Sequence, residues 1–372
     1  MTDHEYIKRT VQLARKGIGY VNPNPMVGSV IVKDGEIVGE GYHQCFGKEH
    51  AEIIAMRYAG EKARGATLYV NLEPCCHYGK TPPCTNAIIK AGIKRVVVGM
   101  VDPNPLVNQR GIEILRQHRI EVITGIEESA CKELNCVFSK FITTGMPYVT
   151  LKIAQSLDGR IATASGHSQW ITSQQARVEA HRIRSENDAI VVGIGTVLAD
   201  NPQLTVRHIK GRNPVRIVLD SLLRISLKSK LLTDDHIHKT VIATTCKDSA
   251  KISQIKKTGA HIWQIEKDKN GKLSIPNLLK KLAQARMSAV MVEGGAQVYT
   301  SFLKEKMVDH IVIALAPKII GTGIEAIGDL GILTVDNSIE LINVKTKKLG
   351  PDLFVSADVS YNSNDAPSLT DE

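Results

Sequence analysis

Two short segments in the early part of the chain contain the residue types of a hydrolytic metal site. His50-Ala51-Glu52 supplies an imidazole and a carboxylate, and Cys75 and Cys84 supply two thiols. Zinc at a hydrolytic site takes three protein ligands and keeps a fourth position open for water. A nearby carboxylate can then carry a proton from that water to a leaving amine. We therefore expect His50, Cys75 and Cys84 to bind Zn²⁺ and Glu52 to be the catalytic residue.

The spacing of the two thiols departs from the simplest pattern for this chemistry. His-x-Glu followed by Pro-Cys-x-x-Cys is the signature of zinc nucleobase deaminases. Here eight residues separate Cys75 from Cys84, but a loop of that length still closes at small entropic cost. Because Pro74 precedes Cys75, we expect Cys75 to open a helix, whose N-terminus favours a thiolate. The alternative is a surface histidine with ordinary buried thiols or a disulfide.

Composition limits the class of protein. The 372 residues allow two domains, and 47 basic against 38 acidic residues give a net charge of +9. The basic residues are scattered, and only five Phe and two Trp are available for base stacking. We expect no nucleic-acid partner and a phosphorylated small molecule as substrate. No apolar run is long enough for a membrane span and the start has no signal-peptide character, so we expect a cytoplasmic protein.

Alternating helix and strand signals position these residues, and the pattern restarts after Thr143-Thr144-Gly145-Met146-Pro147. We expect one domain over residues 1–145, a second over 146–361 and a disordered tail over 362–372. In the first domain the periodicity predicts helices over 4–16, 50–58, 85–90 and 108–118, and strands over 27–32, 36–41, 66–72, 95–101 and 120–124. In the second it predicts strands over 148–154, 189–192, 216–219, 241–244, 289–292 and 311–315, a helix over 174–186, a helix opening near 296 and two C-terminal strands.

The second domain offers weaker chemical signals. Gly193-x-Gly195 and Gly294-Gly295 each follow a predicted strand and could present backbone N–H groups to a phosphate. Arg184 and Arg207 are candidates for a phosphate clamp, because guanidinium groups bind phosphate oxygens in a bidentate manner. The alternatives are tight turns and solvated surface arginines.

Longer motifs strengthen this interpretation. The chain apart from its tail resembles the bifunctional deaminase/reductase family of bacterial riboflavin biosynthesis. The matching segments are Asn22–Gly28, His50–Glu52 and Glu73–Cys84 in the first half, and Lys152, Ser156–Ala162, Trp170–Ser173, Val192–Pro202 and Val292–Gly295 in the second. The resemblance implies an α/β protein with an N-terminal cytidine-deaminase-like α/β/α sandwich and a C-terminal dihydrofolate-reductase-like α/β domain. It also implies Zn²⁺ and NADPH as cofactors and a homo-oligomer, either a dimer or a tetramer.

The resemblance further implies two reactions and the residues that serve them. The first is deamination of a diaminopyrimidinone ribosylamine 5-phosphate, and the second is NADPH-dependent reduction of the ribosyl group to a ribityl chain. For the substrate-binding residues the resemblance implies Asn24, His43, His77, Lys80, Ser168, Arg184, Leu204, Arg207 and Glu293. For the cofactor-binding residues it implies Ala154, Trp170, Thr196, Asp200, Ser221, Gly295, Ala296, Gln297, Val298, Tyr299, Thr300 and Ser301.

Two other classes of function compete with this interpretation. One is a tRNA- or DNA-base deaminase with an accessory binding domain, which the zinc motif and the charge of +9 would allow. The scattered charge and the cysteine spacing argue against it. The other is a binding module stabilised by structural zinc, but such a site would be closed by four ligands and would have no use for Glu52.

Overall fold

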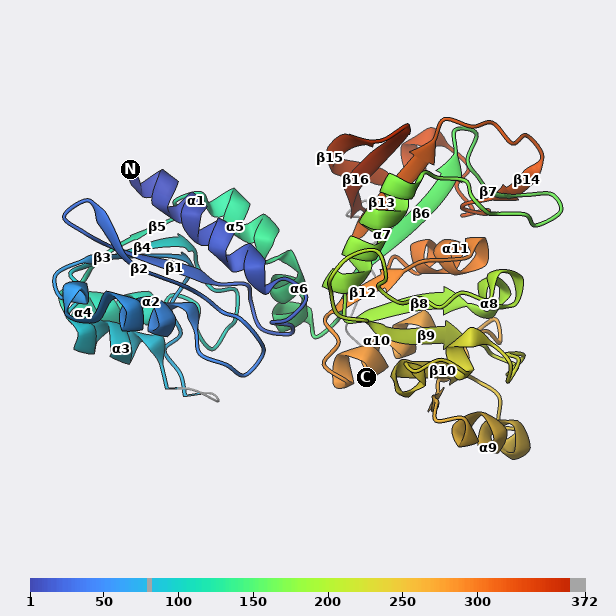
Figure 1. Cartoon of the computed structure of the whole chain (residues 1–372), viewed down its shortest axis with the longest axis horizontal. Helices are drawn as coiled ribbons and strands as arrows, with labels where there is room; N and C mark the ends of the chain where they lie inside the picture. Colours follow the sequence, from blue (N-terminus) through green and yellow to red (C-terminus); the bar gives the residue numbers. More distant parts are fainter. Residues whose placement is uncertain (79–81, 362–372) are drawn as a thin grey trace. The chain divides into compact units, whose positions relative to one another are not determined.

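A computed structural model describes residues 1–78 and 82–361. The chain forms two compact units, Met1–Met146 and Pro147–Glu372, and each is described below by itself (Figure 1). The division lies at the Thr143–Pro147 junction. Lys80 and the tail over 362–372 lie outside the described residues, so the expectations for them stay predictions.

The first unit is built on a five-stranded sheet with the order β2-β1-β3-β4-β5. Strands β1 and β2 pair antiparallel as a hairpin, β1 and β3 are antiparallel, and β3, β4 and β5 are parallel. The turn at Asp34-Gly35 has positive φ at both residues, 50° and 83°, as the Asp-Gly pair predicts. The strands are β1 Gly28–Lys33, β2 Glu36–Tyr42, β3 Thr67–Leu72, β4 Arg95–Met100 and β5 Glu121–Thr124.

Alternation along the buried strands creates an apolar core on each face of this sheet. In β1, Ile31 packs into one core and Val30 into the other; in β4, Val96 and Val97 divide in the same way. Successive side chains of a strand point to opposite faces, so a wholly apolar strand has to be covered on both. Helices α2 Ala51–Ala59, α3 Cys84–Ala91 and α4 Arg110–Gln117 cover one face, and α1 Asp3–Ala14, α5 Glu128–Leu134 and α6 Cys136–Thr144 contribute to the core on the other (Figure 1). This is the α/β/α sandwich that we expected.

Two helices of the first unit, α5 and α6, were not anticipated from the sequence. They fill the segment between the last strand and the junction, and Cys131, Leu134 and Phe138 pack into the core beside α1. Each helix is short, with only one or two fully buried side chains. A helical period is hard to recognise over so few turns.

The second unit contains a nine-stranded sheet with the order β11-β10-β9-β8-β12-β6-β13-β16-β15. Neighbouring strands are parallel from β11 to β13, and β16 and β15 continue the sheet antiparallel. A separate pair, β7 and β14, is antiparallel. The strands are β6 Tyr148–Ser156, β7 Arg160–Thr163, β8 Ala189–Gly193, β9 Val215–Leu219, β10 Thr240–Thr244, β11 His261–Gln264, β12 Ala289–Val292, β13 His310–Ala316, β14 Gly323–Glu325, β15 Glu340–Leu349 and β16 Asp352–Ser360.

Helices connect the parallel strands of this sheet. They are α7 Gln174–Glu186, α8 Ile194–Asp200, α9 Ser249–Lys257, α10 Ile275–Gln284 and α11 Ala296–Lys304. β8 ends directly before α8, and the Gly294-Gly295 pair lies between β12 and α11. Ligands in open α/β sheets bind beyond the carboxyl ends of such strands. This edge is therefore where a second site is expected.

Candidate metal site and second cavity

The three predicted metal ligands meet in the first unit although they come from three different elements. His50 is the N-cap of α2, Cys75 lies after β3, and Cys84 is the first residue of α3. One ligand atom from each residue lies within 4.8 Å of the others. The His50 Nδ1 atom is 3.2 Å from Cys84 Sγ and 3.5 Å from Cys75 Sγ. One imidazole nitrogen and two sulfurs form a donor set that suits zinc and leaves a coordination position for water.

Close approach between backbones allows this arrangement. A Cβ atom at Gly41 of β2 would lie 2.4 Å from the Ala51 carbonyl oxygen and 2.7 Å from the Ala55 nitrogen. Any larger residue at Gly41 would push the start of α2, and with it His50, away from the sheet.

The expectation that Cys75 opens a helix is wrong. Residues 73–76 are not helical, and it is Cys84, preceded by Pro83, that opens α3. The chain therefore contains two Pro-Cys pairs, and only the second marks a helix start. The helix N-terminus still acts on Cys75, because the Cys84 backbone N–H donates a hydrogen bond to Cys75 Sγ at 3.3 Å. Hydrogen bonds from the Cys84 side chain and from His50 outweigh burial and lower the pKa of the Cys75 thiol to about 4. Cys75 is thus a thiolate, the form that binds metal.

Glu52 is the second residue of α2, two positions beyond the ligand His50, and is almost fully buried, with 3% of its surface exposed. Its Oε2 atom has no hydrogen-bond partner among the described residues. Burial raises the pKa of the Glu52 carboxyl group. A buried carboxyl oxygen without a partner is costly in an interior, and a ligand in the adjoining cavity would supply that partner.

That cavity has a volume of about 350 Å³ and is lined by His50, Glu52 and Cys75. Three of the four residues that the resemblance placed here, Asn24, His43 and His77, also line it, whereas Lys80 is not described. The Asn24 side-chain nitrogen is 3.1 Å from His43 Nε2, and His43 Nδ1 is 3.0 Å from the Glu49 carbonyl oxygen. Burial lowers the pKa of His43, so its ring is neutral near pH 7 and available as a hydrogen-bonding group.

Part of the wall was missed from the sequence. Helix α6 contributes Phe138, Phe141 and Ile142, and the segment after β4 contributes Asp102, Asn104 and Val107. Burial raises the pKa of Asp102 to about 7. The α6 residues had no recognisable signal because that helix was not anticipated. Asp102 did have one, because an acidic residue directly follows a buried strand in an α/β fold.

Glu73 binds the backbone of residues 102–112, the segment that contributes Asp102, Asn104 and Val107 to this wall. Its buried carboxylate accepts backbone hydrogen bonds from Asp102 at 3.2 Å, Gln109 at 3.0 Å, Gly111 at 3.0 Å and Ile112 at 3.3 Å. These donors lie at and before the start of α4, where a helix leaves backbone N–H groups without partners. Glu73 therefore ties the 102–112 segment to the strand end that leads into Cys75.

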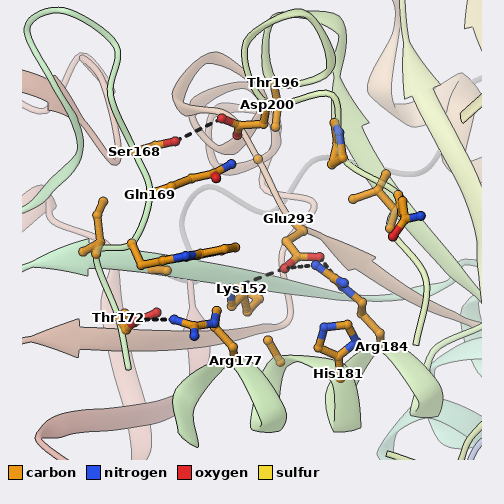
Figure 2. Close-up of a pocket in the computed structure, with 18 of the residues that line it drawn as sticks. Lys152, Ser168, Gln169, Thr172, Arg177, His181, Arg184, Thr196, Asp200 and Glu293 are labelled. Carbon is orange, nitrogen blue, oxygen red and sulfur yellow. Dashed lines mark hydrogen bonds and ion pairs between the residues drawn. The ribbon is translucent and has the colours of Figure 1, made fainter. Parts of the chain in front are cut away.

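The second unit contains a larger cavity of about 710 Å³, lined by Lys152 and Ala154 of β6 and by the segments that follow β8 and β12 (Figure 2). Among the described residues that line it, five carry a positive charge and two a negative one. The cationic residues are Lys152, Arg177, Arg184, Arg207 and Lys230, and the acidic ones are Asp200 and Glu293. A cavity with this excess of positive charge suits phosphate-bearing ligands.

A buried ion-pair cluster forms the floor of the cavity. Arg184 donates from Nε to Glu293 Oε2 at 2.7 Å and from Nη2 to Oε1 at 2.8 Å, and Lys152 Nζ is 3.4 Å from the same Oε1 (Figure 2). Burial opposes ionisation of Glu293, but the charges of Arg184 and Lys152 outweigh it and lower its pKa to about 2. Arg184 is therefore not a free phosphate clamp, because its guanidinium is already engaged by Glu293 and by the Thr205 carbonyl oxygen.

Other parts of the cavity wall bring together predicted cofactor and substrate residues. The Ser168 hydroxyl donates to Asp200 Oδ1 at 3.0 Å, and the Arg177 guanidinium lies 4.3 Å from the Trp170 ring centre. A Cβ atom at Gly295 would lie 3.0 Å from Thr196 Oγ1. The start of α11 has no side-chain cap. A glycine cradle at an uncapped helix N-terminus fits a pyrophosphate of the kind that NADPH contains.

The structure gathers some of the predicted residues of this second site and not others. Those that line the cavity are Ala154, Ser168, Trp170, Arg184, Thr196, Asp200, Leu204, Arg207, Glu293, Gly295 and Tyr299. Those that are not among its lining residues are Ser221, Ala296, Gln297, Val298, Thr300 and Ser301. The Thr300 and Ser301 hydroxyls donate within α11, to the carbonyl oxygens of Ala296 and Gln297. Tyr299 is buried and donates to the Lys152 carbonyl oxygen at 2.6 Å. The lining also includes His181, His208 and Gln169, which were not predicted from the sequence. They are isolated polar residues, and no motif or regular spacing marks them as part of a site.

Comparisons with known proteins agree with this division. Residues 1–100 match the cytidine and deoxycytidylate deaminase zinc-binding region, and residues 147–355 match the RibD C-terminal domain. The riboflavin biosynthesis protein RibD of Aquifex aeolicus is 48% identical over 354 residues, covering 95% of this chain and 97% of that protein. The Escherichia coli protein of the same name is 40% identical, covering 95% and 98%.

Solved structures show the same similarity. Acinetobacter baumannii RibD has a TM-score of 0.86 at 37% identity, covering 96% of this chain and 99% of that one. A Thermotoga maritima diaminohydroxyphosphoribosylaminopyrimidine deaminase/5-amino-6-(5-phosphoribosylamino)uracil reductase has a TM-score of 0.84 at 37% identity, with the same coverage. Such similarity along nearly the whole chain favours a riboflavin enzyme over the nucleic-acid deaminase alternative.

In the part of the chain that the structure describes, no helix is both long and apolar enough to cross a bilayer.

Three findings lead to one assignment. They are the three-ligand zinc site beside the buried Glu52, the second, cationic cavity, and relatives that match nearly the full length of the chain. The chain belongs to the RibD family of riboflavin biosynthesis proteins, a bifunctional enzyme with a zinc-dependent deaminase half and a reductase half.

Proposed function

We propose that the chain catalyses two successive steps on one phosphorylated pyrimidine. The first is hydrolytic deamination of 2,5-diamino-6-(5-phosphoribosylamino)pyrimidin-4(3H)-one by residues 1–145. The second is NADPH-dependent reduction of the ribosyl group by residues 146–361, which yields 5-amino-6-(5-phosphoribitylamino)uracil. The observation that carries the proposal is the cluster of His50, Cys75 and Cys84 beside the unpartnered Oε2 of Glu52.

In the first unit, His50, Cys75 and Cys84 hold the zinc ion. When bound there, zinc supplies Lewis-acid activation of a water molecule. Glu52 accepts a proton from the water and delivers it to the departing 2-amino group, so that ammonia leaves. The proton-transfer role suits this carboxyl group because burial raises its pKa above the ordinary value and so favours the form that carries a proton. Asn24, His43 and His77 orient the substrate by hydrogen bonds, and Lys80 is assigned to its phosphate.

In the second unit, NADPH supplies the hydride when it is bound. Gly295, Thr196, Asp200, Trp170 and Ala154 line its binding surface, and Ser221 with the Ala296–Ser301 turn of α11 extends it. Ser168, Leu204, Arg184 and Glu293 contact the substrate, and Arg207 binds its phosphate. Lys152 lies 3.4 Å from Glu293 and extends the polar floor beneath the reacting sugar.

The remaining parts of the proposal concern partners and location. The substrates are small molecules, with no nucleic-acid partner. A homo-oligomer is supported by edge strand β15, which leaves Leu341, Ile342 and Val344 exposed, since exposed apolar edge strands tend to pair with another chain. A cytoplasmic location is supported by the two metal-ligand thiols, which must stay reduced to bind zinc.

The test is an assay at the NADPH absorbance band, with the diaminopyrimidinone substrate and with its deaminated product. Removing zinc with a chelator should abolish oxidation of NADPH with the first compound and leave it intact with the second. Equal loss with both compounds would contradict the assignment of the two chemistries to separate sites.

A further inference from the structure

Lys48 is a cation on the wall of the cavity beside the metal site. Among the described residues that line this cavity it is the only lysine or arginine, and its side chain is exposed. The same lining contains the carboxyl groups of Glu52, Glu73 and Asp102. A phosphorylated substrate adds negative charge to these acidic groups, so a cation in contact with its phosphate would offset the repulsion. Lys48 is the described residue that can supply this charge.

Backbone hydrogen bonds fix the loop that carries Lys48 and leads from β2 to α2. The Lys48 N–H donates to the Cys45 carbonyl oxygen at 3.1 Å and closes a turn. Gly47, at the third position of that turn, has a positive φ of 78°, the conformation that a type II turn requires there. The Phe46 N–H donates to the Tyr20 carbonyl oxygen at 3.1 Å, which ties the loop to the segment that follows α1. The loop therefore holds the Lys48 backbone in a defined place on the cavity wall.

The protein leaves the ammonium group of Lys48 available to a ligand. Among residues 1–78 and 82–361, no carboxylate lies within ion-pair distance of it. The adjacent acidic residue, Glu49, is paired instead with Arg57, with 2.7 Å between Oε2 and Nη1. A lysine ammonium group has three N–H donors and no acceptor, and it binds phosphate as a point charge. Lys48 thus has unused donors on the wall of the cavity.

We propose that Lys48 binds the 5-phosphate of the pyrimidine substrate in the deaminase half, in addition to the contact assigned to Lys80. The phosphate takes no part in the deamination, and its charge is the same in the substrate and in the transition state. The contact with Lys48 therefore stabilises both states equally, which affects the Michaelis constant and not the turnover number. The inference rests on the proposed function, because it assumes that this cavity binds a phosphorylated pyrimidine.

The experiment measures ammonia release by the zinc-loaded full chain without NADPH, so that only the first reaction proceeds. Two substrates are compared, the phosphorylated diaminopyrimidinone and the same compound without its phosphate. Lys48→Gln should raise the Michaelis constant for the phosphorylated compound by roughly tenfold, because a hydrogen bond between two charged groups is lost. The turnover number should stay at the wild-type value. The phosphate-free compound should be deaminated equally well by the variant and the wild type.

Two further variants separate the charge of Lys48 from other effects of the substitution. Lys48→Arg keeps a cation with N–H donors and should retain most of the affinity for the phosphorylated compound. Lys62→Gln removes an equal charge from an exposed position in the 3₁₀ turn after α2, which is not among the described residues that line the cavity. It should behave as the wild type does. Because Lys48 is exposed, its substitution should leave the fold intact, and an unchanged melting temperature and zinc content would verify this.

The possible results are distinct. An unchanged Michaelis constant in Lys48→Gln, or an equal rise for both compounds, would overturn the role of Lys48 and leave the proposed function intact. A lower turnover number with an unchanged Michaelis constant would overturn it as well, since the residue would then act on the chemistry. A rise of the same size in Lys62→Gln would reduce the effect to one of net charge and would also overturn it. If the wild type releases ammonia from neither compound, the proposed function itself fails.

Discussion

Arg184 donates two parallel hydrogen bonds to Glu293, from Nε to Oε2 at 2.7 Å and from Nη2 to Oε1 at 2.8 Å. Both side chains are mostly buried, with 12% and 9% exposed. In the sequence alone, Arg184 and Arg207 are equivalent candidates for a phosphate clamp. The structure separates them, because Arg184 completes a buried ion pair and Arg207 has no carboxylate partner in the described part of the chain.

Replacing each arginine should therefore have different consequences. Arg184→Ala removes one partner of a buried pair and should destabilise the second unit by about 3–5 kcal/mol. Arg207→Ala should cost less than about 0.5 kcal/mol and mainly raise the Michaelis constant for the phosphorylated substrate. Calorimetric melting and steady-state reduction kinetics measure the two effects. Equal melting temperatures for the two variants would contradict the distinction.

Acid should weaken the Arg184–Glu293 pair within a definite pH window. The pKa of Glu293 is lowered from an ordinary value of 4.5 to about 2. A carboxyl group with a lowered pKa stabilises the fold fully above its unfolded value, and that contribution is lost as the pH falls toward the folded value. The melting temperature of the second unit should thus fall between pH 4.5 and 2, and Glu293→Gln should flatten that decrease. An unchanged slope in Glu293→Gln would show that other groups dominate.

Replacing Glu52 should separate the two activities. Glu52→Gln keeps the shape of the side chain but cannot carry a proton, so deamination should fall by roughly 10²–10⁴-fold. Reduction of pre-deaminated substrate should continue, because every described residue that lines the second cavity belongs to the second unit. Glu61→Gln, at an exposed carboxylate of the same unit, is the control and should retain both activities. Deamination near the wild-type rate in Glu52→Gln would refute the proposed role.

Substitutions of Cys75, Cys76 and Cys84 should have different effects on the amount of bound zinc. Cys75→Ser and Cys84→Ser should each lower bound zinc and abolish deamination, because each removes one of three ligands. Cys76→Ser should keep its zinc, since Cys76 Sγ contacts the Leu106 carbonyl oxygen at 3.9 Å and is not part of the metal cluster. Zinc per chain is measured by atomic emission. Zinc lost from Cys76→Ser and kept in Cys84→Ser would mean that the wrong pair has been chosen.

A substitution at Gly111 tests how closely the chain packs against Pro74, next to the metal ligand Cys75. A Cβ atom there would lie 2.2 Å from the Pro74 carbonyl oxygen and 3.2 Å from Glu73 Oε1. Gly111→Ala should therefore destabilise the first unit by about 1–3 kcal/mol and weaken zinc retention, because the clash falls next to Cys75. Gly195→Ala is the comparison, since no described atom outside its own helix lies within 4 Å of the added Cβ. It should leave stability unchanged or raise it slightly. A stable, zinc-retaining Gly111→Ala would contradict the close packing of this segment.

Much of the protein is determined by residue types and their local spacing. The ligands His50, Cys75 and Cys84, the carboxylate Glu52 and most strands were predicted from the sequence, because metal chemistry limits the choice of side chains and buried strands form apolar runs. Helix α7 was predicted with its observed bounds, Gln174–Glu186. The sequence did not show that a helix starts at Cys84, because the two Pro-Cys pairs look alike. The short helices α5 and α6 were also not predicted.

Only the tertiary structure decided which charged groups meet. Glu73 reaches the backbone of residues 102–112, Glu293 reaches Arg184 from 109 positions away, and His181 reaches the backbone of Arg207. These contacts depend on which strands lie side by side and on which carboxyl ends share an edge. No spacing along the chain encodes that order, because it follows from packing every apolar strand and helix face into common cores.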